Sequence, residues 1–193
     1  MTSSNLLGPD VTDAWGSEVA EVDVLGHPCL SFVKRRRHLA DLLIDGRRFG
    51  AREYLVQGER RMSFDQHEAA VRRAAGLLRG NGVRRGDRVM LLGANSAEWV
   101  VGYWAILAAD AIVVLGNAWW SQVELAHALR NVAPGLVLTD AARATSLPAG
   151  QARLAFTDLA TRRQTGNFWN KEYEGDYLPM VYLDEHGQLA GGG

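Results

Sequence analysis

Two short apolar patterns open the body of the chain. The apolar residues of segment 37–44 are spaced as on one face of a short helix, which Gly46 or Gly50 would end. Residues 54–64 contain two short strand-like runs separated by polar turn residues. This second pattern predicts a β-hairpin.

Two serine-based capping boxes mark the starts of amphipathic helices. Ser63 is followed three residues later by Gln66, and Ser121 is followed at the same spacing by Glu124. Each serine can accept a backbone N–H of the first turn while its partner side chain reaches back to the cap. The buried stripe of the first helix is expected to consist of Ala70, Val71, Ala74, Ala75 and Leu78.

Three short apolar runs, at residues 88–92, 111–115 and 136–138, predict buried strands. A helix that is apolar nearly all round lies between the first two runs, and Asn95 with Glu98 is expected to cap it. Because strands and helices alternate, the pattern favours right-handed crossovers. The predicted fold class is α/β, a mainly parallel sheet flanked by helices.

The chain is expected to have three parts. Residues 1–33 show no sustained period and predict an irregular lead segment, whereas residues 34–160 carry the α/β body. Residues 161–193 are polar and aromatic without either period, and they form an atypical tail. Within that tail, residues 181–190 could form a short hairpin.

Composition narrows the function classes. The 193 residues are 47% hydrophobic and 22% charged, as in an ordinary globular protein. Acids and bases nearly cancel at a net charge of −1, so no nucleic-acid partner is expected. No apolar run is long enough for a transmembrane segment, and the single cysteine, Cys29, fits a cytoplasmic location.

Several segments of the body resemble a known family in their order and spacing. They are Met62 to Phe64 before a long helix, Gly80 to Val89, Gly93 to Trp99, Trp104 to Val114, Asn117, and Glu124 to His127. Over residues 36–140 the chain resembles the start of the AMP-forming acyl-CoA synthetase and adenylating ligase superfamily. The resemblance implies part of the N-terminal domain of an adenylate-forming enzyme. It also implies a parent reaction in which a carboxylic acid, with a fatty acid favoured, is activated by ATP and Mg²⁺ and transferred to coenzyme A.

The sequence departs from the family pattern in two ways. Asp110 stands where the family usually has glycine, and Leu115-Gly116 replace a proline and a hydrophobic residue. More seriously, the family's Ser/Thr/Gly-rich ATP loop ending in Pro-Lys-Gly is absent from this sequence. Lys34 and Lys171 are the two lysines of the chain, and Lys171 lies in no matching motif. We therefore assign no catalytic, cofactor-binding or metal-binding residue.

Other chemical interpretations are weaker than structural ones. The basic run 34–38 is interpreted as a solvated face, and Gly93 to Ser96 as a capped helix start rather than a phosphate site. Trp119 and Trp120 are expected to be partly buried. Cys29 is interpreted as an inert thiol. The five histidines lack metal-ligand spacing.

Two functions follow from these observations. The leading hypothesis is a truncated acyl-CoA synthetase-like protein that is inactive alone, with ATP, Mg²⁺ and coenzyme A belonging to the parent family. The alternative is a non-catalytic binding module that pairs with another protein chain through an exposed sheet edge or apolar face.

Overall fold

The computed structural model describes residues 18–36 and 38–159. They fall into two units, with the boundary between Leu42 and Leu43. The elements, in chain order, are β1 (Val19–Val24), β2 (His27–Phe32), α1 (Asp41–Gly46), η2 (Arg47–Phe49), β3 (Glu53–Gln57), β4 (Arg60–Ser63), α2 (Phe64–Gly80), β5 (Arg88–Leu92), α3 (Ala97–Ala108), β6 (Ile112–Gly116), α4 (Gln122–Val132), β7 (Leu136–Thr139), α5 (Ala141–Ala144), β8 (Arg153–Ala155) and η3 (Phe156–Leu159).

The described part of the first unit contains an antiparallel hairpin, β1 with β2. The expectation that residues 1–33 are irregular is therefore wrong for residues 19–32. The tight turn between the two strands stabilises the hairpin. Leu25 and Gly26 both take positive φ, and the Gly26 N–H donates to Asp23 Oδ1 at 2.9 Å. The division of the chain at residues 33 and 160 stays a prediction.

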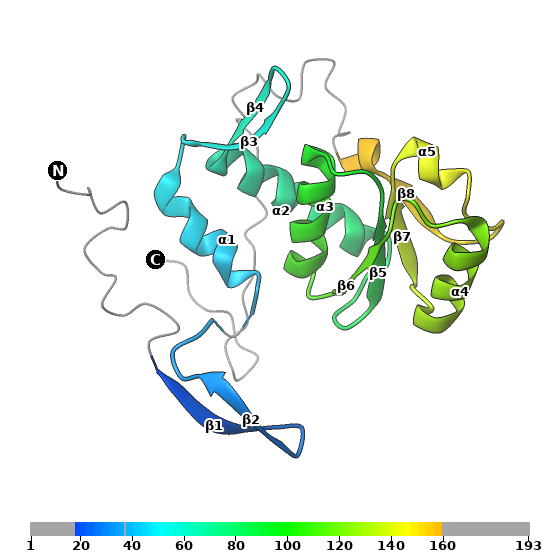
Figure 1. Ribbon diagram of the computed structural model, residues 1–193. Helices are drawn as coiled ribbons and strands as arrows, with labels where there is room; N and C mark the ends of the chain where they lie inside the picture. The colour runs from blue at the N-terminus through cyan, green and yellow to red at the C-terminus, as the bar shows by residue number, and fades with distance from the viewer. Residues whose placement is uncertain (1–17, 37, 160–193) are drawn as a thin grey trace. The chain divides into compact units, whose positions relative to one another are not determined.

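The second unit is built on a parallel sheet of four strands in the order β6-β5-β7-β8 (Figure 1). This confirms the predicted α/β fold. The predicted hairpin at residues 54–64 is also confirmed, as β3 paired with β4. The short strand β8 was not predicted, because three residues are too few to show a period.

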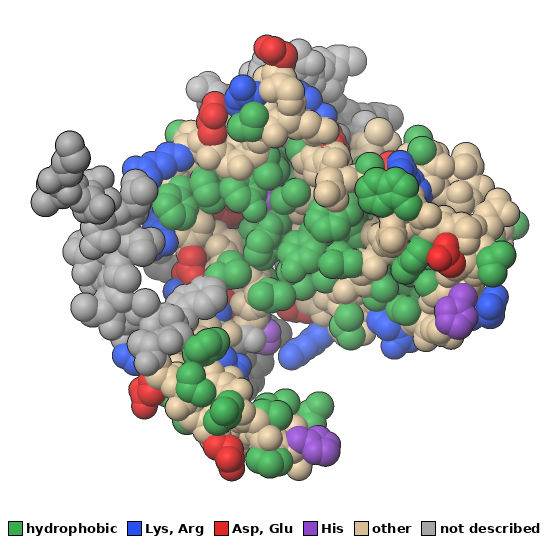
Figure 2. Space-filling view, viewed as in Figure 1, with side chains coloured by type: hydrophobic (Ala, Val, Ile, Leu, Met, Phe, Trp, Pro, Cys, Tyr) green, Lys and Arg blue, Asp and Glu red, His purple; other side chains and the backbone are tan. Residues whose placement is uncertain are grey.

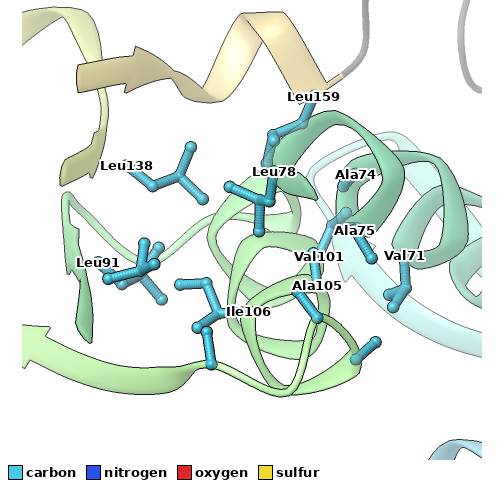
Figure 3. Close-up of a cluster of buried hydrophobic side chains, with 14 of the residues drawn as sticks. Val71, Ala74, Ala75, Leu78, Leu91, Val101, Ala105, Ile106, Leu138 and Leu159 are labelled. Atoms are coloured by element: carbon cyan, nitrogen blue, oxygen red, sulfur yellow. The ribbon is translucent and has the colours of Figure 1, made fainter. Parts of the chain in front are cut away.

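Two apolar layers cover the faces of this sheet. Side chains alternate between faces along a strand, so Leu91 and Leu138 face α2 and α3, whereas Met90 and Val137 face α4. Figure 3 shows part of the first layer, with labelled side chains from α2, α3, β5, β7 and η3. The five predicted stripe residues of α2 are fully buried.

Both predicted capping boxes are present. Ser63 accepts the N–H of Gln66 at 3.2 Å, and Ser121 accepts that of Glu124 at 3.3 Å. The prediction that Asn95 caps α3 is wrong, because Ser96 is the cap and accepts the Trp99 N–H at 3.1 Å. No helix within the described ranges, 18–36 and 38–159, is long and apolar enough to cross a membrane.

Candidate functional site at the carboxyl ends of the parallel strands

The strand order creates a switch point between β5 and β7. These strands are neighbours, yet β5 continues into α3 on one face of the sheet and β7 continues toward Leu147 on the other. In open α/β sheets, ligands bind outside the carboxyl ends of two such strands. The loop after Leu92 and the loop after Thr139 therefore form the first place to look for a site.

Asp140 occupies this switch point. Its Oδ2 accepts the backbone N–H of Ala94 at 2.9 Å, and its Oδ1 accepts that of Arg143 at 2.8 Å. Oδ2 also pairs with Arg143 Nη1 at 3.1 Å. The same guanidinium donates from Nε to the carbonyl of Ala118 at 3.2 Å. Asp140 and Arg143 thus tie together the loops that follow β5, β6 and β7.

The ring of Phe156 packs against Gly93, directly after the carboxyl end of β5. A Cβ added to Gly93 would lie 2.5 Å from Phe156 Cε2 and 3.2 Å from Asp140 Oδ2. Phe156 belongs to η3 and is buried. Only glycine fits here, because contacts this short force a shift of the aromatic ring. The switch point is therefore filled by the chain's own side chains.

The start of α3 is equally occupied. Ser96 takes the N–H of Trp99, and the Ala97 N–H donates to Gln57 Oε1 of β3 at 3.1 Å. A phosphate at a helix start needs free N–H donors and no competing negative charge. With Asp140 beside this loop and these donors engaged, the geometry favours the interpretation of residues 93–96 as a capped helix start.

The adjacent loop presents one tryptophan to solvent and partly buries the other. The Trp119 N–H donates to Asn117 Oδ1 at 2.9 Å, and its side chain is 81% exposed. Trp120 instead packs against the apolar layer of Met90 and Leu125. The expectation of partial burial is confirmed for Trp120 and wrong for Trp119, because the Asn117 turn directs neighbouring residues to opposite sides.

The edge strand beside this loop is apolar and exposed. β6 pairs with β5 on one side, and Ile112 and Leu115 are 52% and 55% exposed. Val123, in the first turn of α4, is also exposed. Figure 2 shows apolar side chains gathered over α3 and β6. The surface beside the candidate site is therefore better suited to contact with another polypeptide than to binding a small charged ligand.

The remaining candidate residues are each described within their own unit. Cys29 is exposed in β2, which belongs to the first unit. His67 is buried in α2, where it contacts Tyr54 rather than the strand ends. Among the residues that the structure describes, no group of three or more His, Cys, Asp or Glu could hold a metal ion. Lys171, His186 and the predicted hairpin at 181–190 lie outside the described residues.

Sequence reasoning missed Asp140 and Arg143. Their signal is an Asp at an N-cap position three residues before an Arg, directly after an apolar run. That pattern is common at helix starts and indicates a cap more readily than a tie between loops. The partner at Ala94 lies 46 positions away, so only the sheet order brings the two together.

The comparisons with known proteins decide the family. The family model for AMP-binding enzyme matches residues 44–174, which is more than half of the chain. The chain belongs to the AMP-binding enzyme family. This family comprises AMP-forming acyl- and aryl-CoA ligases, which confirms the resemblance stated above. Its match covers the whole four-stranded sheet.

Curated relatives from this family are similar over part of the chain. A 3-hydroxybenzoate–CoA ligase of Aromatoleum sp. (strain CIB) is 30% identical over 87 residues, which are 45% of this chain and 17% of the relative. A mitochondrial medium-chain acyl-CoA ligase of Rattus norvegicus is 39% identical over 87 residues, 44% of this chain and 14% of the relative. The matched part of the chain thus spans less than a fifth of either relative's length.

Solved structures of AMP-binding enzymes share the fold. O-succinylbenzoate coenzyme A synthetase from Bacillus subtilis, solved with ATP and magnesium ion, matches 61% of this chain and 33% of its own at 25% identity, with a TM-score of 0.57. The N-terminal subdomain of NpsA from Klebsiella oxytoca, solved with 3-hydroxyanthranilyl-AMSN, matches 78% of this chain and 36% of its own at 20% identity, with a TM-score of 0.61. Both likenesses show that the described part of this chain shares its fold with these structures, the second of which is an N-terminal subdomain.

Proposed function

We propose that this chain supplies the N-terminal α/β scaffold of an AMP-forming acid–CoA ligase and does not form an acyl-adenylate by itself. The observation that carries the proposal is the filled switch point, where Asp140 takes the Ala94 N–H and Phe156 covers Gly93. A scaffold needs such internal ties. A nucleotide site needs open donors at the same place.

The parent reaction explains what is missing. A carboxylate must attack the α-phosphate of ATP, and cationic groups must offset the charge that develops between two anions. The described residues at the strand ends do not fit ATP or Mg²⁺, because both oxygens of Asp140 already accept N–H groups and its charge is paired with Arg143. The sequence also contains no Ser/Thr/Gly-rich loop ending in Pro-Lys-Gly.

Pyrophosphate release tests the absence of activity. The purified 193-residue chain is incubated with ATP, Mg²⁺ and a panel of aliphatic and aromatic acids, beside a full-length ligase as positive control. We expect no acid-dependent release above background. Acid-dependent turnover by the pure chain above background would overturn the proposal.

A chimera tests the scaffold role and the acyl class. Residues 44–159 of this chain replace the matching segment of the rat medium-chain acyl-CoA ligase, whose own name motivates fatty acids as the proposed substrate class. We expect acid-dependent release of pyrophosphate with medium-chain acids. A folded but inactive chimera would contradict the scaffold role, and a switch to aromatic acids would contradict the fatty-acid assignment.

A second candidate function is a binding module. The exposed Ile112 and Leu115 on edge strand β6, together with Trp119, favour association with another polypeptide. Sedimentation velocity across a hundredfold range of concentration tests self-association, and the same experiment with a purified full-length ligase tests pairing between chains. A monomer that sediments unchanged in both series would count against this function.

A cytoplasmic location stays a prediction.

A further inference from the structure

His67 is a buried histidine that the proposed function does not use. It lies in the first turns of α2 and is 3% exposed. Its ring centroid lies 4.6 Å from that of Tyr54 in β3, and the Tyr54 ring in turn lies 4.6 Å from Phe64. Its buried Nε2 has no hydrogen-bond partner in the described structure. A polar nitrogen is thus held in an aromatic pocket between a helix and a hairpin strand.

The pocket suits a neutral imidazole and opposes a charged one. Burial lowers the pKa of His67 from 6.5 to about 4, although the nearby Glu68 carboxylate acts in the opposite direction. That carboxylate is itself engaged by Arg47 from η2 and by Arg72 of the same helix. From β3, the titratable group that faces His67 is the Tyr54 phenol. Glu68 is therefore poorly placed to neutralise an imidazolium.

The β3–β4 hairpin is held to the rest of the unit by a few contacts. Gln57 accepts the Ala97 N–H, Arg60 pairs with Glu98, and Met62 is buried in the apolar layer. The Tyr54–His67 contact joins the start of the hairpin to α2. Leu55 of β3 also packs, partly buried, against the apolar layer, and the Tyr54 ring also contacts Phe64 of α2. The hairpin is the element that a charge on His67 would disturb first, because the Tyr54 ring lies directly against the imidazole.

We propose that His67 is an acid-sensitive latch: its neutral ring holds the β3–β4 hairpin against α2, and protonation releases the hairpin while the parallel sheet stays folded. The linkage sets the pH window. The released state binds the proton near the ordinary histidine value and the closed state binds it only in stronger acid, so closure weakens as pH falls from about 6.5 toward 4. The hairpin opening constant rises about 30-fold between pH 7.5 and pH 5.

Amide hydrogen exchange of the full chain tests the latch. Protection factors, corrected for the intrinsic effect of pH, are compared for residues 53–63 and for β5. We expect hairpin protection to fall about 30-fold at pH 5 while β5 protection changes less than threefold. An equal loss of protection in both segments would mean global unfolding and would overturn the latch.

Variants separate His67 from the other acid-sensitive groups. His67→Phe keeps a ring in the pocket and removes the titration, so its hairpin protection should not depend on pH in this range. The matched control is His127→Gln, on α4, where the imidazole contacts Asn131 in an exposed position. Hairpin release that persists in His67→Phe would assign the effect to a group other than His67, such as Glu68, and contradict the proposal.

The wild-type protein provides a measurement that needs no variant. Imidazole NMR titration of the full chain reports each histidine, and the His67 resonance should change together with hairpin protection. An imidazole that titrates near 6.5 while the hairpin stays protected would overturn the latch, whatever the behaviour of the variants.

Discussion

The carboxylate of Asp140 accepts the backbone N–H of Ala94 at 2.9 Å and so ties the loop after β7 to the loop after β5. Asp140 is also the N-cap of α5. An Asp140→Ala change leaves the Ala94 and Arg143 N–H groups without this acceptor and should lower the free energy of unfolding by about 2–3 kcal/mol. Urea denaturation measures the loss.

The control for this prediction is Asp87→Ala. The Asp87 side chain accepts the Arg84 N–H at 2.8 Å, a bond within its own exposed turn. Its loss should cost about 1 kcal/mol or less. Equal losses for the two variants would show that the tie between the loops adds nothing beyond an ordinary turn bond.

The close approach at Gly93 predicts a size limit. Gly93→Ala places a methyl group against the Phe156 ring and should destabilise the fold by about 1–3 kcal/mol. Gly76→Ala, in the interior of α2 where an added Cβ meets nothing within 4 Å, should instead stabilise by about 0.5–1 kcal/mol. Thermal unfolding of both variants checks the opposite signs, and a stabilised Gly93→Ala would contradict the packing.

Asp110 has a backbone conformation that explains the family's usual glycine at this place. Its φ is +61°, in the left-handed region, at the turn between α3 and β6. Asp110→Gly should leave the unfolding free energy within about 0.5 kcal/mol, whereas Asp110→Val should lower it by about 1–2 kcal/mol. Chemical denaturation distinguishes them. If Asp110→Val left the free energy of unfolding unchanged, the turn would have to adopt another conformation.

The ion pair between Arg60 and Glu98 joins β4 to the first turn of α3. Both side chains are partly exposed, so a double-mutant cycle with Arg60→Met and Glu98→Gln should give a coupling of about 0.5–1 kcal/mol. Repeating the cycle in 1 M NaCl should reduce it. A coupling near zero at low salt would show that this ion pair does not stabilise the attachment of the hairpin to α3.

Elements with a long or self-contained pattern could be predicted from the sequence. The α2 stripe, the capping boxes at Ser63 and Ser121, and β5 follow from local periodicity. Ser96 was missed because it adjoins Asn95, an equally good cap, while the side chain of Glu98 is committed to Arg60 in β4. A distant partner thus decided between two neighbouring residues.

The candidate site was less predictable because it depends on the strand order. Nothing local shows that β7 lies beside β5 rather than β6, and that placement brings Asp140 to Ala94. Trp119 was misjudged for a related reason. Its exposure follows from the edge position of β6 and from the Asn117 turn, neither of which is evident in a pair of adjacent tryptophans.

The central position of β5 also determines the order in which this sheet can assemble. β5, α3 and β6 follow one another in the sequence, so their pairing needs a short loop closure and can form early. The pairing of Val89 with Leu136 must wait for α4 and β7, which arrive later in synthesis. Until then the Met90 and Leu92 side of β5 has no cover from α4. A chain in which α4 and β7 have not yet been synthesised therefore lacks the cover for one apolar face of the β5–β6 pair.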